Sequence, residues 1–150
     1  MKYLTLFILL GFGVSCAPQN ALKLHHKRKY TETNNLKVDS NLKLEQHIFY
    51  NSGAVDGWKS YLLILEILDT EKFKNLKTIQ LPQHKNIVDV SFNISSPWFW
   101  EEIKTKISGE IKLLNWTEKK IELKENLLVK VENSKGYRFK GIRDFTKKEK

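Results

Sequence analysis

The chain has 150 residues, a formal net charge of +9 and a single cysteine. A hydrophobic fraction of 41% and an aromatic fraction of 11% exclude a disordered composition, and the length allows one domain with a real core. One cysteine excludes a framework of internal disulfides, and the positive charge raises three partners: nucleic acid, anionic lipid and other acidic polymers.

The N-terminus has the parts of a secretory leader. Lys2 supplies a positive charge, residues 3–14 form a short apolar stretch, and small residues precede Cys16. The apolar stretch is shorter than the roughly 20 residues that span a bilayer. Pro18 follows closely and lacks the backbone donor that a continuing helix requires.

The end of this leader, Gly13-Val14-Ser15-Cys16, resembles the lipobox of bacterial lipoproteins, although Gly13 stands where that family most often has leucine. The resemblance implies a signal peptide over residues 1–15 and a diacylglycerol on the Cys16 sulfur, which would consume a thiol without a disulfide partner. An ordinary secretory signal and an uncleaved anchor are the alternatives. The resemblance covers about 20 residues and implies no fold.

The same resemblance implies a location in the cell membrane or outer membrane, with the domain facing the periplasm or the exterior. Ala17, in place of the aspartate that retains some lipoproteins in the inner membrane, leaves outer-membrane sorting open. Export argues against nucleic acid as a partner.

Residues 16–40 are predicted to be the lipidated cysteine and a flexible basic tether, because they contain few residues of the kind that fill a core. Residues 25–29 form a dense basic run. This run would contact an anionic membrane surface beside the anchor, or it is simply a solvated part of the tether.

From about Leu42 the pattern changes to the period-two alternation of β-strands. It is clearest over residues 88–94, where apolar and polar side chains alternate strictly. Residues 61–68 are almost continuously apolar and predict a buried strand or a short helix. Residues 69–77 predict a loop or a helical turn, and residues 78–81 a short strand.

Residues 97–106 support two interpretations. Ser96 followed by Pro97 is typical of a helix start, whereas an extended segment would place Trp98 and Trp100 on one face. The sequence does not choose between helix and strand here.

Trp98, Phe99 and Trp100 are the candidate binding residues. Neighbouring side chains of an extended segment point to opposite faces, so three consecutive aromatics cannot all enter one core. An exposed aromatic would stack on a sugar or anchor a protein partner, in a cluster that could include Trp58 and Trp116. Alternatively, Trp98 and Trp100 cap the sheet interior and Phe99 covers an edge.

The last third of the chain predicts a three-stranded antiparallel meander, with turns near residues 117–120 and 133–136. The alternation breaks at Ser108-Gly109 and near Glu125-Asn126, which predicts bulges at both places. Arg143 lies on the last strand, where it could pair with a glutamate on a neighbouring strand.

We therefore expect a signal peptide, a tether and one mainly β domain over residues 41–146. Seven or eight short strands, with at most one or two short helices, predict an antiparallel sandwich or partly closed barrel with a C-terminal meander.

No catalytic constellation is evident, and no enzyme activity is predicted. Carboxylates such as Asp56, Asp89 and Glu110 could be brought together by folding, but nothing in the sequence selects them. His47 and His84 are isolated, so neither a metal site nor a cofactor is expected.

The predicted function is that of a lipid-anchored envelope protein whose small non-catalytic domain binds a protein partner. A carbohydrate- or cell-wall-binding lipoprotein that uses an aromatic patch is the alternative, and a small envelope hydrolase is less favoured. Lysine and glutamate are interleaved over residues 101–125, which is more typical of a solvated face than of a binding patch.

Overall fold

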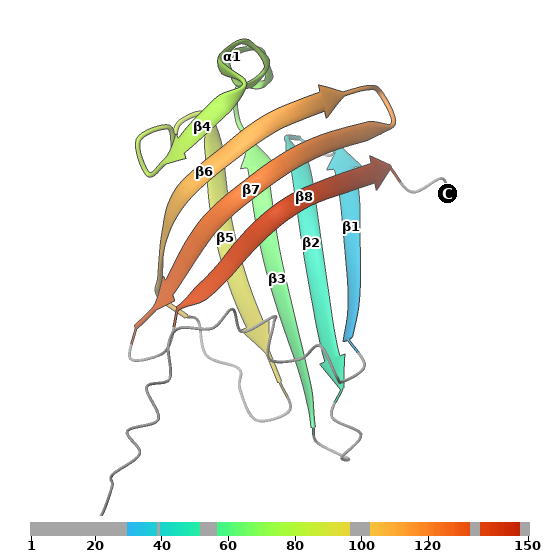
Figure 1. Ribbon diagram of the computed structural model, residues 1–150, viewed down its shortest axis with the longest axis vertical. Coiled ribbons are helices and arrows are strands. Elements are labelled where there is room, and N and C mark those ends of the chain that lie inside the picture. Colours follow the sequence, from blue (N-terminus) through green and yellow to red (C-terminus); the bar gives the residue numbers. More distant parts are fainter. Residues whose placement is uncertain (1–29, 39, 52–56, 97–102, 133–135, 148–150) are drawn as a thin grey trace, which may run out of the picture.

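The computed structural model describes residues 30–38, 40–51, 57–96, 103–132 and 136–147 (Figure 1). The predicted fold class is confirmed: these residues are mainly strands of one sheet that nearly closes into a barrel, with one short helix. The elements in chain order are β1 (Tyr30–Val38), β2 (Leu42–Asn51), β3 (Trp58–Ile67), α1 (Thr70–Leu76), β4 (Thr78–Leu81), β5 (Val88–Ser95), β6 (Thr105–Trp116), β7 (Lys120–Val131) and β8 (Tyr137–Lys147).

The sheet has the strand order β4-β6-β7-β8-β1-β2-β3-β5. In Figure 1 the curved strands β6, β7 and β8 cross in front of β1, β2, β3 and β5, and the predicted C-terminal meander is one of these two layers. Every pairing is antiparallel except that of β8 with β1, which is limited to Asn35 with Thr146 and Leu36 with Lys147. The two layers are thus joined through one short parallel contact.

Strict alternation in β3 shows why these segments form a half-buried sheet. Tyr61, Leu63, Leu65 and Ile67 are buried, and the residues between them are only partly so. Because successive side chains of a strand point to opposite faces, the apolar set of each strand meets the others inside the barrel. The largest fully buried side chains are Phe73, Phe139, Phe145, Leu44, Ile48, Leu63, Leu65, Ile79, Ile111, Ile121, Leu123 and Leu127.

Strand β1 lies within the segment expected to be tether, so the folded part begins ahead of the predicted boundary at residue 41. Its pairing with β2 runs through the whole strand, from Tyr30 opposite Tyr50 to Val38 opposite Leu42. Leu36 is the buried apolar side chain of this strand. With so few apolar residues, β1 lacks the hydrophobic alternation by which the other strands are recognised.

Residues 69–77 contain the short helix α1 with its two caps, and a helix is one of the two predicted possibilities. Asp69 caps α1 by accepting a hydrogen bond from the backbone N–H of Lys72 at 2.9 Å, which satisfies a donor that the first turn leaves free. The helix buries Phe73, whose ring meets Trp116 edge-on at a centroid distance of 6.0 Å. That contact fixes α1 over the end of the barrel where β6 terminates.

The bulges predicted in the meander are wrong in position. The pairing of β6 with β7 is continuous at Gly109 and at Glu125, and its register shifts between Leu113 and Asn115. Gly109 has φ +127°, and a side chain there would collide with the backbone oxygen of Asn126. Glu125 broke the hydrophobic alternation only because a charged residue occupies an inward position of a regular strand.

Candidate binding surfaces

The predicted site residues Cys16, Trp98, Phe99 and Trp100 lie outside the described residues. In the sequence, the three aromatics fall in the connection between β5 and β6. The surfaces described below were therefore found from the fold alone.

Trp58 and Trp116 do not form one cluster, which corrects that part of the aromatic-patch hypothesis. Trp58 stacks on Phe49 with ring centroids 6.2 Å apart. Trp116 packs on Phe73, and the Lys74 ammonium lies 4.9 Å from its ring centroid. The start of β3 and the end of β6 are at opposite ends of the barrel (Figure 1).

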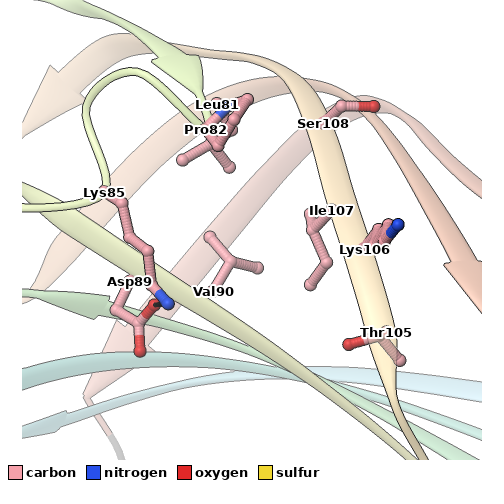
Figure 2. A pocket seen from close by; sticks show the side chains of 9 residues that line it. All are labelled: Leu81, Pro82, Lys85, Asp89, Val90, Thr105, Lys106, Ile107 and Ser108. Carbon is pink, nitrogen blue, oxygen red and sulfur yellow. Dashed lines mark ion pairs between the residues drawn. The ribbon is translucent and has the colours of Figure 1, made fainter.

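The barrel is open between β5 and β6. Strand β5 pairs with β3 on one side only, and β4 covers β6 only from Gly109 to Lys112. A cavity of about 360 Å³ lies along this opening, with side chains from both sides directed into it (Figure 2). Its lining residues are Leu81, Pro82, Lys85, Asp89, Val90, Thr105, Lys106, Ile107 and Ser108. We call this cavity the seam groove.

The seam groove combines an apolar floor with polar strand edges. Leu81, Val90 and Ile107 form the floor, and Lys85 pairs with Asp89 at 3.6 Å on one rim. An edge strand leaves every second backbone N–H and C=O group without a ladder partner. The groove therefore offers hydrogen-bonding backbone on its flanks and hydrophobic contact beneath.

A second cavity of about 310 Å³ adjoins the seam groove at the start of β6. The residues that line it are Lys104, Thr105, Lys106, Lys130, Val131 and Glu132. Three of these six side chains are lysines, so the local charge is positive.

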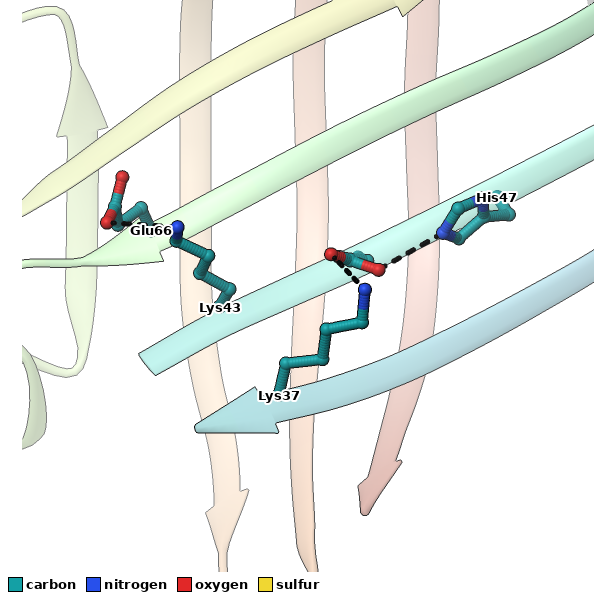
Figure 3. A network of polar contacts seen from close by, with 5 residues as sticks. Lys37, Lys43, His47 and Glu66 are labelled. Carbon is teal, nitrogen blue, oxygen red and sulfur yellow. Dashed lines mark hydrogen bonds and ion pairs between the residues drawn. The ribbon is translucent and has the colours of Figure 1, made fainter. Parts of the chain in front are cut away.

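The outer surface of β1, β2 and β3 carries a network of paired charges (Figure 3). Glu45 lies 2.8 Å from the Lys37 ammonium and 3.2 Å from Nε2 of His47, and Lys43 lies 3.7 Å from Glu66. Burial raises the pKa of Glu45, but hydrogen bonds and charges from Lys37 and His47 outweigh it, so the pKa is lowered overall. This surface is close to electrically neutral.

Polar side chains also meet inside the barrel, where β1 diverges from β8. Arg143 Nε lies 2.8 Å from Glu32 Oε1, which accepts hydrogen bonds from Gln46 at 3.0 Å and Asn34 at 3.4 Å. The expectation that Arg143 pairs with a glutamate on a neighbouring strand is met by Glu32. Gln46 is fully buried, and its amide oxygen has no hydrogen-bond partner among the described residues.

Glu125 completes this interior group and was missed by the sequence analysis. It is fully buried, and neither carboxylate oxygen has a hydrogen-bond partner in the described part of the chain. Burial raises its pKa to about 7; the charge of Arg143 opposes that rise and the charge of Glu32 adds to it. The sequence does contain a signal for this residue, since Glu125 is a single glutamate within an alternating apolar segment. The prediction made from that break in the alternation is a bulge, and not an inward-facing carboxyl group.

In the described ranges, no group of three or more His, Cys, Asp or Glu side chains could hold a metal ion. His84 is occupied locally, since its Nδ1 accepts a hydrogen bond from the backbone N–H of Gln80 at 3.1 Å. No helix in these ranges has the length and apolar character needed to cross a membrane.

Comparison with known proteins finds no matching family model, no matching curated protein and no matching solved structure.

Proposed function

We propose that this chain is a lipid-anchored protein of the bacterial cell envelope whose barrel is a non-catalytic module that binds a protein partner in the seam groove. The observation that carries the proposal is the pair of unpaired strand edges, on β5 and on residues 105–108 of β6, that flank an apolar floor. An extended peptide adds to such an edge through backbone hydrogen bonds, while its alternate side chains enter the pocket.

The groove chemistry favours binding over catalysis. Among the described residues, Asp89 is the single carboxylate that lines the seam groove, and it is paired with Lys85; Glu132 is the single described carboxylate in the adjoining cavity. The described residues bring together in neither cavity two carboxylates that converge on one bond, as glycoside hydrolysis requires. The interior residues Glu32 and Glu125 line neither of them.

The anchor in this proposal rests on the lipobox-like sequence that ends at Cys16. A Cys16→Ala variant should lose fatty-acid labelling and leave the membrane fraction. If membrane attachment survives this change, the lipoprotein part of the proposal is wrong, whatever the seam groove binds.

The groove is tested by a photo-crosslinking amino acid placed at Thr105, which lines the groove, in intact envelopes. We expect one discrete protein adduct, and Val90→Trp, which fills the groove, should reduce its yield about ten-fold, equivalent to about 1.4 kcal/mol of binding free energy. Leu62→Trp, on the outer surface of β3, is the matched control and should leave the adduct unchanged.

A cross-linker at Thr33, on the outer surface of β1, reports non-specific proximity. Equal adducts from Thr33 and Thr105, or an adduct that is insensitive to Val90→Trp, would show that the groove is not the binding site. Far-ultraviolet circular dichroism of each variant verifies that the barrel is intact.

A further inference from the structure

The outer surface of β6, β7 and β8 carries six cations that have no acidic partner among the described residues. All six are exposed, and they are spread over the three strands. They are Lys106, Lys112, Lys124, Lys130, Arg138 and Lys140. We call this surface the basic face.

Four of these cations oppose one another across the sheet. Lys106 is directly opposite Lys130, and Lys112 is directly opposite Lys124, in the pairing of β6 with β7. Directly opposed residues hold their Cβ atoms about 4.5–5.5 Å apart, and like charges at that separation are destabilising. An anion placed between the paired lysines would relieve this repulsion.

The acidic residues of the same surface are already engaged. Glu122 and Asp144 both pair with Lys120, at 3.7 and 3.0 Å, and Glu110 accepts a hydrogen bond from Gln80 at 2.6 Å. Counted against Lys120 and the six cations, these three carboxylates still leave the outer surface of β6, β7 and β8 with a net charge of +4 among the described residues (7 − 3).

The outer surface of β1, β2 and β3 behaves differently. There, Lys37 pairs with Glu45 and Lys43 pairs with Glu66 (Figure 3). The fold thus separates neutralised lysines on one layer from unpaired cations on the other.

We propose that the basic face docks on an anionic lipid surface, with headgroup phosphates between the opposed lysines. Lys112, Lys124, Arg138 and Lys140 cover a broad strand surface, and Lys106 and Lys130 extend it to the rim of the second cavity, which matches a planar array of phosphates. Each lysine or arginine close to an anionic bilayer contributes about 1 kcal/mol, so several together hold a domain against the surface. The inference rests on the lipid anchor of the proposed function.

The chain between the anchor and the barrel is long enough for this arrangement. Cys16 and Tyr30 are separated by a segment whose extended length is at most about 50 Å. The twelve-residue strands β6 and β7 are about 40 Å long. An anchored domain can therefore reach the bilayer with the side of its barrel.

The test uses the whole chain with Cys16→Ala, so that no acyl group contributes to membrane binding. Flotation is measured with phosphatidylcholine vesicles and with vesicles that contain about 30% phosphatidylglycerol, whose negative surface potential attracts basic residues. The neutral vesicles measure any contribution of the apolar leader, which is the same in every variant.

One variant combines Lys106→Gln, Lys112→Gln, Lys124→Gln and Lys130→Gln. Its partition onto anionic vesicles should fall at least 100-fold, since about 1 kcal/mol per lysine corresponds to roughly five-fold each. The control combines Lys37→Gln, Lys43→Gln, Lys59→Gln and Lys72→Gln, which changes the net charge equally but leaves the basic face and the seam groove intact, and it should partition like the parent chain.

Binding of the parent chain should also weaken steeply with added salt, because exposed charges are screened. Equal binding of the two four-lysine variants, or equal binding to neutral and anionic vesicles, would overturn the proposal. Binding to polyglutamate without binding to anionic vesicles would replace the lipid with an acidic protein. Absence of fatty-acid labelling in the parent chain would overturn the lipid anchor alone. The flotation assay uses the Cys16→Ala chain and therefore does not depend on acylation.

Discussion

Glu125 and Gly141 lie directly opposite each other on β7 and β8, and the missing side chain of the glycine makes room for the Arg143 guanidinium. A Cβ atom at Gly141 would lie 2.5 Å from Arg143 Nη1. A buried carboxyl group is thereby accompanied by the positive charge of Arg143, which also pairs with Glu32 inside the barrel.

Glu125→Gln should remove a pH dependence of stability. The pKa of Glu125 is raised to about 7 by burial, so the folded state keeps a proton that the unfolded chain releases near its ordinary value of 4.5. Stability should fall as the pH rises through this interval, by roughly 3 kcal/mol in total, and be lowest above pH 7.

Urea unfolding at pH 5 and pH 8 measures this effect. The parent chain should be less stable at pH 8, and Glu125→Gln should lose most of the difference. Glu122→Gln, whose side chain is on the outer surface of the same strand, is the control and should keep it. Equal pH dependence of the parent and Glu125→Gln would contradict the buried-carboxyl account.

Gly141→Ala should destabilise the barrel by about 2–3 kcal/mol, because φ of +149° is strained for a residue with a side chain and the Arg143 guanidinium must move. Thermal unfolding provides the measurement. Gly136→Ala is the comparison, since its nearest neighbours would be 3.3 Å away and its φ requires no glycine. A similar loss of thermal stability in the two variants would show that position 141 tolerates a side chain no worse than position 136.

Asp69→Ala should cost about 1 kcal/mol through loss of the helix N-cap. Glu71→Ala, in the first turn of the same helix but exposed, should cost less. Chemical denaturation distinguishes the two variants. An Asp69→Ala variant as stable as the parent would mean that the cap does not contribute.

Lys112→Glu should stabilise the sheet by roughly 0.5 kcal/mol, because it converts a directly opposed pair of like charges into an attractive pair with Lys124. The double change Lys112→Glu with Lys124→Glu restores like charges and should lose that gain. Equal stability of the single and double variants at low salt would mean that the two positions do not interact.

Hydrophobic alternation was sufficient to predict the fold class and the C-terminal meander. In β5 the apolar side chains recur at every second position, and this period follows from strand geometry whichever strand is the partner. Strand β1 escaped prediction because its place in the sheet comes from pairing with β2 and from the interior bonds of Glu32, which the local sequence does not display.

The seam groove, the interior polar group and the basic face were decided by tertiary structure. The sequence established one cysteine behind an apolar N-terminal segment and an interleaved run of lysine and glutamate. Only the register of β6 with β7 places Lys112 opposite Lys124, and only the barrel turns Glu125 inward beside Arg143. Lysine and glutamate residues that alternate along the chain do not alternate across the sheet, because strand pairing places residues that are distant in sequence next to each other.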